Sequence, residues 1–308
     1  MTISLTVVLC TYRPNLKRLS RTLSALKSQS LAPSKWELVL VDNGSSPPIN
    51  VADVELYAPS NTRILVEPRP GLTAARRCGF ANCRGQVIVL VDDDNVLEPE
   101  YLERVIHLFE AHPQLGVVGG KVLPEFEREP EPWMREFDSL LACRDYGPEP
   151  LVAVAAQNGS EISYPAFAPI GAGMAMRACA LKQWLREPAS SLLTDRKGSD
   201  LTSGGDNDII FSISLSGWSV GYFPQLSLTH LIAAERTTAA YLARLNQGIQ
   251  KSWIQVLRKY DASPWPTIAG WTVPIRKAKA WLSYRPWSTA AADVRWRGAC
   301  GHFEGRAR

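Results

Sequence analysis

The first 124 residues alternate short apolar runs with segments of helical periodicity, and this alternation is the feature that most limits the fold. The apolar runs, each short enough for one strand, are ISLTVVLC, WELVLV, TRILV, QVIVLV and LGVVGGKV. Between the first two, Asn15 to Ser28 carries leucines spaced by three and four residues, which predicts a helix. Strands and helices that alternate over short connections form a mostly parallel sheet with helices on its faces. We therefore expect an α/β fold.

The composition is that of a globular protein. The chain has 308 residues, of which 45% are hydrophobic and 21% charged, enough to bury a sizeable core. No apolar run approaches the roughly 18 residues of a membrane-spanning helix, and the first residues lack the pattern of a signal peptide. We therefore expect a cytosolic protein. The six cysteines show no CxxC pair, so we expect reduced thiols and no cysteine-based zinc site.

The charge is distributed unevenly along the chain. Residues 235–308 hold 13 Lys/Arg against 4 Asp/Glu, a net charge of +9, whereas residues 1–234 carry −5. The same tail holds six of the ten tryptophans and, from Tyr241 to Tyr260, an amphipathic pattern that predicts a helix. Basic residues mixed with tryptophan are typical of contact with an anionic membrane surface or nucleic acid. The alternative that the tail packs its tryptophans against the main domain is also open. Beyond Asp261 the sequence pattern does little to determine the secondary structure.

Three adjacent carboxylates end the run VIVLV. They are Asp92, Asp93 and Asp94. Like charges this close are costly without an opposite charge or good solvation. Ligands of open α/β sheets bind at the carboxyl ends of the strands, and hard oxygen donors there suit Mg²⁺ or Mn²⁺ that carries a diphosphate. One of the acids would suffice as the N-cap of the next helix, so a cluster of three favours a ligand site.

Together with its neighbours, this cluster resembles the metal-binding DxD signature of family-2 glycosyltransferases, which have the GT-A fold. The resemblance covers about the first 235 residues. VVLCTYRPNLKRLSRTLSAL is similar to the first strand and helix of the family, and ELVLVDNGSS to its second-strand motif. The resemblance implies that Thr11 and Tyr12 lie at the substrate and that Asp42 contacts the nucleotide base.

The segment GLTAARRCGFANCRGQVIVLVDDDNVLEP resembles the family stretch that leads into DxD, with Pro70 and Arg77 where asparagine is common. By this resemblance Arg76 faces the nucleotide. Asp92 lies near the ribose or phosphate, and Asp93 also belongs to the substrate site. Asp94 is the metal ligand.

Two later motifs follow in the same order as in the family. SGGDNDIIFSISLSGW is similar to the segment that supplies the catalytic base, which implies that Asp206 is the base and Asp208 a later, substrate-binding acid. Gly205 stands where the family usually has Glu. QLSLTHLI resembles the strand whose histidine completes the metal site, which would be His230.

Two glycines in IGAGMAM would let the backbone approach the sugar or the acceptor closely. They are Gly171 and Gly173, and Gly173 is our candidate for the substrate site. The alternative that both glycines only allow a tight turn is also open.

The implied activity is metal-dependent, inverting transfer of a sugar from a UDP-, GDP- or dTDP-sugar to a glycan or lipid-linked acceptor. Mg²⁺ or Mn²⁺ is the implied cofactor. Surface polysaccharide, lipopolysaccharide and glycolipid synthesis all fit. We expect a cytoplasmic protein, peripheral on the cytoplasmic face of a membrane if the tail binds lipid, and no nucleic-acid partner.

The sequence argues against two other classes of enzyme and one class of non-catalytic protein. A sugar-phosphate nucleotidyltransferase would carry a glycine-rich loop after the first strand, where this chain has CTYRPNLKR. A Rossmann dehydrogenase would need GxGxxG at that place. A non-catalytic, membrane-associated protein with a vestigial fold would be expected to lose some of the site acids, and all are present.

We therefore predict a GT-A-type, Rossmann-like fold with a mixed, mostly parallel sheet. Residues 1–235 form the glycosyltransferase domain, with a nucleotide-binding half at about 1–124 and an acceptor half at about 151–235. Residues 236–308 form a helical, basic, tryptophan-rich extension.

Overall fold

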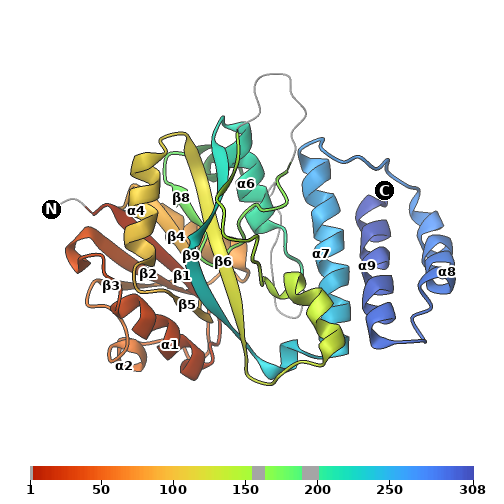
Figure 1. Ribbon diagram of the computed structural model, residues 1–308, viewed down its shortest axis with the longest axis horizontal. Helices are drawn as coiled ribbons and strands as arrows, with labels where there is room; N and C mark the ends of the chain where they lie inside the picture. Colours follow the sequence, from red (N-terminus) through yellow and green to blue (C-terminus); the bar gives the residue numbers. More distant parts are fainter. Residues whose placement is uncertain (1–2, 155–163, 189–200) are drawn as a thin grey trace. The chain divides into compact units, whose positions relative to one another are not determined.

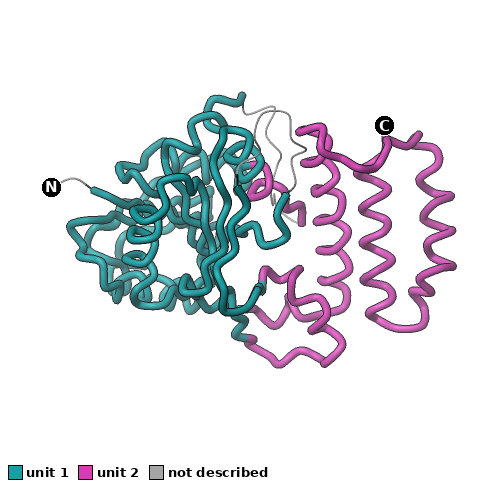
Figure 2. Tube along the Cα trace, turned by 45° about the horizontal axis from the view of Figure 1, so that its top comes forward, with its two compact units in different colours: residues 1–125, 143–191, 209–231 teal, residues 126–142, 192–208, 232–308 magenta. Residues whose placement is uncertain are grey.

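The computed structural model of the chain describes residues 3–154, 164–188 and 201–308. These residues form two compact units, which Figure 2 colours teal and magenta. Unit 1 consists of residues 1–125, 143–191 and 209–231, and unit 2 of residues 126–142, 192–208 and 232–308. The last segment of unit 2 begins close to the boundary that the sequence predicts at residue 235. Unit 2 also takes in two earlier segments of the chain.

Unit 1 is built on one mixed sheet with the strand order β3-β2-β1-β4-β8-β6-β9-β5, and β7 pairs with β9. The strands are β1 (Leu5–Thr11), β2 (Trp36–Asp42), β3 (Thr62–Val66), β4 (Val87–Asp92), β5 (Asn95–Leu97), β6 (Leu115–Phe126), β7 (Leu151–Ala153), β8 (Ala175–Arg177) and β9 (Ser219–Ile232). Strands β3, β2, β1 and β4 are parallel, whereas β8 is antiparallel to β4 and β6, and β9 is antiparallel to β5 and β7. The expected α/β fold with a mixed sheet is confirmed, and the parallel pairs belong to its first half.

The helices of unit 1 follow the predicted pattern. They are α1 (Leu16–Lys27), α2 (Val51–Val54), α3 (Leu72–Ala81), α4 (Tyr101–Ala111) and α5 (Lys182–Arg186), with a 3₁₀ turn η1 (Pro33–Lys35). The Asn15 side chain caps α1 by accepting hydrogen bonds from the backbone N–H groups of Lys17 and Arg18. Helix α6 (Gly205–Leu215) is followed two residues later by Gly217, whose φ of 85° lies in the left-handed region.

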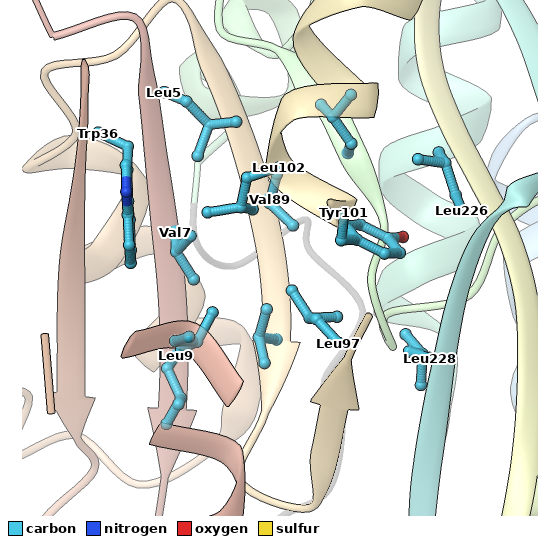
Figure 3. Packing of buried hydrophobic residues seen from close by; sticks show 14 of the residues in the cluster. Leu5, Val7, Leu9, Trp36, Val89, Leu97, Tyr101, Leu102, Leu226 and Leu228 are labelled. Carbon is cyan, nitrogen blue, oxygen red and sulfur yellow. The ribbon is translucent and has the colours of Figure 1, made fainter. Parts of the chain in front are cut away.

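The core of unit 1 lies between the sheet and the helices. Figure 3 shows Leu5, Val7 and Leu9 of β1 near Val89 of β4, all fully buried. Burial on both faces explains why the parallel strands read as continuous apolar runs and not as alternating ones.

Unit 1 contains one strand that the sequence analysis does not predict. Ala175–Arg177, directly after the glycines of IGAGMAM, is strand β8, paired with both β4 and β6. Its three residues are too few to show a periodicity, so only the pairing partners reveal the strand.

Unit 2 contains three long helices, α7 (Ala239–Lys259), α8 (Val273–Tyr284) and α9 (Ala290–Arg306), and the 3₁₀ segments η2 (Pro132–Leu141), η4 (Ala234–Arg236) and η5 (Gly270–Thr272). Figure 1 shows α9 between α7 and α8. The predicted helix from Tyr241 to Tyr260 is confirmed as α7. Within the described residues, no helix is both long and apolar enough to cross a membrane.

Much of the apolar side of α7 is buried inside the protein. Leu242, Leu245 and Val256 are at most 1% exposed. Helix α9 comes very close to α7, because a Cβ atom at Gly301 would lie 2.0 Å from the carbonyl oxygen of Gln247. The amphipathic pattern of α7 therefore serves packing within unit 2.

Candidate active site

The candidate site is built at the ends of strands β4, β5 and β9. Residue Asn95 of β5 lies opposite His230 of β9 in the antiparallel register, and the backbone N–H of Leu231 donates to the carbonyl oxygen of Asp94 at 2.8 Å. This pairing places His230 Nε2 3.4 Å from Asp94 Oδ2. Both residues are buried. The two residues predicted to hold a metal are thus adjacent in space although far apart in sequence.

The sequence analysis missed a side chain that contacts two of the three aspartates, Asp92 and Asp94. Asn95 Nδ2 donates to Asp94 Oδ1 at 3.1 Å, and Asn95 Oδ1 accepts from the backbone N–H of Asp92 at 3.0 Å. Asn95 is fully buried. An asparagine directly after an acidic run was the available signal, since its amide can bond both a carboxylate and a backbone N–H.

Asp93 points to strand β1. The Thr11 hydroxyl donates a hydrogen bond to Asp93 Oδ2. Tyr12 follows and is 51% exposed, with the Arg13 guanidinium 5.3 Å from the centre of its ring. Two of the predicted substrate residues, Thr11 and Asp93, therefore contact each other, and an exposed aromatic ring follows Thr11 in the chain.

Asp42 at the end of β2 is fully buried and organises the loop after it. Its Oδ1 accepts from the backbone N–H of Ser45 and its Oδ2 from that of Ile49, both at 3.0 Å. A contact with a nucleotide base stays a prediction. The structure adds a role that the sequence analysis did not foresee, namely fixing the loop from Asn43 to Ile49.

The neighbouring Asn43 connects this loop to the start of helix α3. Its Nδ2 donates to the carbonyl oxygens of Glu67 and Arg69, and its Oδ1 accepts from the backbone N–H of Gly71 at 2.8 Å. Gly71 is the N-cap of α3, the helix that carries Arg76. The side chain of Asn43 thus helps to fix the position of that helix.

Arg76 is a buried cation close to the aspartates. It is 3% exposed. Burial raises the pKa of the Cys10 thiol to about 12, while the nearby Arg76 opposes that rise and Asp92, paired with Cys10 across strands β1 and β4, adds to it. Arg76 and Asp92 thus act with opposite sign on the same buried thiol.

Arg77, the next residue, has a different task. Its guanidinium donates to the carbonyl oxygens of Leu185 and Glu187 at 3.0 and 3.1 Å and lies 5.6 Å from the Trp184 ring centre. These contacts hold the end of α5.

Gly173 has a structural reason to be glycine. Its φ is 74°, and a Cβ atom there would lie 2.5 Å from Leu228 and 2.6 Å from the Tyr101 hydroxyl. The same hydroxyl donates to the Gly173 carbonyl oxygen at 2.6 Å. Core packing therefore accounts for this glycine, and its contact with substrate stays a prediction.

Asp206 and Asp208 belong to unit 2 and lie in the first turn of α6. Asp208 is fully buried, with Lys259 Nζ 2.6 Å from its Oδ1 and the Tyr260 hydroxyl donating to the same oxygen at 3.0 Å. Asp206 is partly exposed. The structure thus separates the two acids, since Asp208 is tied to α7 by an ion pair and Asp206 reaches the surface.

Asp94 and His230 fit a divalent cation in donor chemistry. A carboxylate oxygen and an imidazole nitrogen 3.4 Å apart can both contact one ion. Residues 3–154, 164–188 and 201–308 contain no group of three or more His, Cys, Asp or Glu side chains placed to hold a metal. Mg²⁺ and Mn²⁺ accept such a sparse set, because waters and substrate phosphates complete their coordination.

The sequence profile of Glycosyl transferase family 2 matches residues 6–175, more than half of the chain. The protein belongs to this family. The match covers nearly all of β1 and the three aspartates and ends at Ala175, the first residue of β8. The predicted resemblance is confirmed. His230 and Asp206 lie outside the matched residues.

Two curated relatives of this family-2 glycosyltransferase illustrate the similarity. The glucosyl-dolichyl phosphate glucuronosyltransferase of Haloferax volcanii is 30% identical over 169 residues, which is 51% of either chain. The succinoglycan biosynthesis protein ExoM of Rhizobium meliloti is 23% identical over 250 residues, 79% of this chain and 72% of ExoM. The chain thus spans about half the length of the first relative.

Solved structures show the same fold. A mannosyltransferase of Pyrobaculum calidifontis in complex with GDP-Man and Mn²⁺ has a TM-score of 0.56 and 17% identity, over 96% of this chain and 74% of that one. TarS of S. aureus, residues 1–349, has a TM-score of 0.52 and 13% identity, over 99% of this chain and 90% of that one. The GT-A fold expected from the motifs is confirmed.

Proposed function

We propose that this family-2 glycosyltransferase is an inverting enzyme that transfers a sugar from a nucleotide-diphosphate sugar to a hydroxyl group of a glycan or lipid-linked acceptor. The observation that carries the proposal is the adjacency of Asp94 and His230, 3.4 Å apart at the end of the sheet. UDP-, GDP- and dTDP-sugars are the candidate donors. The complex of the Pyrobaculum calidifontis mannosyltransferase with GDP-Man and Mn²⁺ supports a donor of this class.

Asp94 and His230 would hold Mg²⁺ or Mn²⁺. When bound, the cation supplies Lewis-acid neutralisation of the leaving diphosphate. Asn95 keeps the Asp94 carboxylate in one orientation by donating to its Oδ1. The other oxygen of this carboxylate, Oδ2, is the atom nearest His230 Nε2, at 3.4 Å.

The remaining residues of unit 1 would bind the nucleotide. Asp42 would contact the base, Tyr12 offers an exposed ring beside Thr11, and Arg76 would attract the phosphates. Asp92 and Asp93 would contact the ribose and the sugar. The sugar site would also include Gly173.

Asp206 would act as the general base, a role that rests on its position in the motif SGGDND. The acceptor hydroxyl gives its proton to the carboxylate while its oxygen bonds to C1 of the sugar. The bond between C1 and the diphosphate oxygen breaks, and its electron pair leaves with the nucleoside diphosphate. Attack from the opposite face inverts the anomeric centre. Base assistance of this kind contributes about 10²–10⁴-fold to the rate. Asp208 would contribute to the acceptor side through the position of α6.

We place the reaction on the cytoplasmic side of a membrane, in the synthesis of surface polysaccharide, lipopolysaccharide or glycolipid. The names of two relatives support this choice. One is a succinoglycan biosynthesis protein, and the other is a glucosyl-dolichyl phosphate glucuronosyltransferase.

Calorimetric titration with UDP, GDP and dTDP, each with Mn²⁺ and with a chelator, tests the donor site. We expect one diphosphate to bind only with Mn²⁺, and Asp94→Asn to abolish that binding. Asp261→Asn is the matched control, because Asp261 is exposed and its φ of 52° suits asparagine equally well. If none of the diphosphates binds under any condition, the proposal fails.

The base is tested separately in the enzyme with its donor and acceptor. Asp206→Asn should lower kcat by about 10²–10⁴-fold and leave the affinity for the diphosphate unchanged. A variant that keeps the wild-type kcat would remove Asp206 from the mechanism without affecting the metal site.

A further inference from the structure

Helix α8 has one face turned to the rest of unit 2. Ala280 is the buried residue of this helix. Lys277 Nζ lies 2.6 Å from Glu304 of α9, and the indole N–H of Trp296 donates to the Lys277 carbonyl oxygen at 3.2 Å. Figure 1 shows α8 beside α9 on the side away from α7. The α9-facing side of α8 is therefore defined by Lys277 and Ala280.

The opposite face of α8 is apolar and exposed. Ile275 lies two residues before Lys277 and Leu282 two residues after Ala280, and two residues turn a helix by about 200°. Their side chains are 62% and 64% exposed, and Trp271, in the 3₁₀ segment η5 directly before α8, is 75% exposed. Isolated exposed apolar residues are common, but a row of them along one helix face marks an interaction surface.

The surroundings of this face carry positive charge. Residues 262–292 contain four Lys/Arg and no Asp or Glu. Lys277 is neutralised by Glu304, whereas Arg276, Lys279 and Arg285 have no carboxylate within ion-pair distance in the part of the chain that the structure describes. Three cations therefore surround the apolar row without a protein counter-charge.

Two tryptophans lie at the edge of this face, near the C-terminal end of α8. The rings of Trp281 and Trp287 are tilted by 45° with their centres 4.2 Å apart, and the side chains are 42% and 58% exposed. Tryptophan rings favour the boundary between lipid headgroups and acyl chains, and a helix that joins such rings to aliphatic side chains and basic residues lies flat in that boundary.

We infer that the outer face of α8, from Trp271 to Trp287, docks on the surface of an anionic lipid bilayer. Ile275 and Leu282 would enter the acyl boundary, and Lys279 and Arg285 would contact the anionic headgroups. Nucleic acid would satisfy the charge but not the aliphatic row. A second copy of the chain, paired through the same face, would bring three cations against three cations. An anionic bilayer matches both the charge and the apolar surface.

This inference rests on α8 alone and not on the proposed reaction. It assigns the lipid contact to α8, whereas the basic amphipathic pattern of α7 is used for packing.

Co-sedimentation of the full chain with vesicles tests the docking face, without donor or acceptor. We expect binding to vesicles of phosphatidylcholine mixed with phosphatidylglycerol and much weaker binding to phosphatidylcholine alone. Lys279→Gln/Arg285→Gln removes two charges, each worth about 1 kcal/mol, and should weaken binding by roughly 30-fold. Ile275→Ser/Leu282→Ser should abolish it. Both pairs are exposed, so the variants should keep the thermal transition of the parent chain.

Leu56→Ser is the matched control, because Leu56 is 70% exposed but lies in unit 1. It should bind vesicles like the parent chain. Absence of binding to the anionic vesicles, or equal binding by all variants, overturns the inference. So does a lipid-free dimer, seen by light scattering, that Ile275→Ser/Leu282→Ser dissociates, because the face would then bind a second copy. None of these results bears on nucleotide binding, so the proposed reaction is judged separately.

Discussion

At the scale of single residues, the acidic side chains of this protein fall into groups with different partners. Asp94 has an amide and an imidazole beside it, Asp42 has two backbone N–H groups, and Asp208 has a lysine. The first set brings together a carboxylate oxygen and an imidazole nitrogen, both of which are donor atoms that a divalent cation uses. The sequence predicts all three acids as site residues, and their partners distinguish what each is able to do.

Removing the lysine that pairs with Asp208 should destabilise the protein. Lys259→Met removes the ammonium group that lies 2.6 Å from the fully buried Asp208 carboxylate, and breaking such a pair costs about 3 kcal/mol. Denaturant unfolding measures the loss. Lys251→Met, on the same helix, is the control and should change the free energy of unfolding little. The double variant Asp208→Asn/Lys259→Met should recover part of this loss. If the losses in unfolding free energy of the two single variants simply add up in the double variant, the ion pair is contradicted.

The buried thiol of Cys10 should make the protein less stable in alkali. Its pKa rises from 9.0 to about 12 on folding, chiefly because of burial. Between these values the unfolded chain binds fewer protons than the folded one, so the free energy of unfolding falls as the pH rises, by up to about 1.4 kcal/mol per pH unit. The stabilisation is complete below pH 9 and lost toward pH 12.

Urea unfolding at a series of pH values, compared between the parent chain and Cys10→Ala, measures this slope. The variant should be less stable at neutral pH because of its cavity, yet show a shallower decline in alkali. Burial also raises the pKa of Cys83 to about 12, so Cys83→Ala should likewise reduce the decline of the unfolding free energy with pH. Identical slopes in all three chains would show that these thiols do not titrate differently on folding.

At the scale of helices and strands, unit 2 depends on a close approach between α7 and α9. Three glycines of α9 face α7, because Cβ atoms at Gly298, Gly301 and Gly305 would all lie within 3 Å of α7 atoms. Glycine is a poor helix former, so sequence periodicity gave no reason to expect α9. The helix is formed because its glycines allow two backbones to pack directly.

Adding one methyl group at this contact should therefore be costly. A Cβ atom in Gly301→Ala would lie 2.0 Å from the backbone oxygen of Gln247, which forces the helices apart despite the better helix propensity of alanine. We expect a loss of about 2 kcal/mol in the free energy of unfolding. Arg297→Ala, on the same helix with 45% side-chain exposure, should change the stability little. An unchanged or higher melting temperature for Gly301→Ala would refute the close packing.

At the scale of the whole molecule, the two units are not successive pieces of chain. Unit 2 combines residues 126–142 and 192–208 with the tail from residue 232 onward, and Arg295 of α9 pairs with Glu136 of η2 at 2.7 Å. The tail thus completes a unit that earlier residues begin. A boundary at residue 235 divides the motifs of the family from the tail but does not divide the compact units.

Removing the tail should accordingly harm the folding of what remains. A chain that ends at Arg236 loses Lys259 and Tyr260, the partners of buried Asp208, and leaves η2 without α7. We expect low soluble yield and no cooperative thermal transition for this fragment, because loss of α7 would expose apolar side chains of η2 such as Met134 and Phe137, which are buried in the full chain. A fragment that melts cooperatively near the temperature of the full chain would show that residues 1–236 fold without the tail.

The sequence by itself determined the strands and helices of the nucleotide-binding half, because their apolar periodicity is local, and it determined the order of the family motifs. It also indicated which acids follow strands, since Asp42 and Asp92 end continuous apolar runs. Only the tertiary structure decided that His230 lies beside Asp94, that Asp208 is paired with Lys259, and that α8 and not α7 leaves an apolar face uncovered. These outcomes depend on strand register and helix packing between residues far apart in the chain, and no local pattern records such partners.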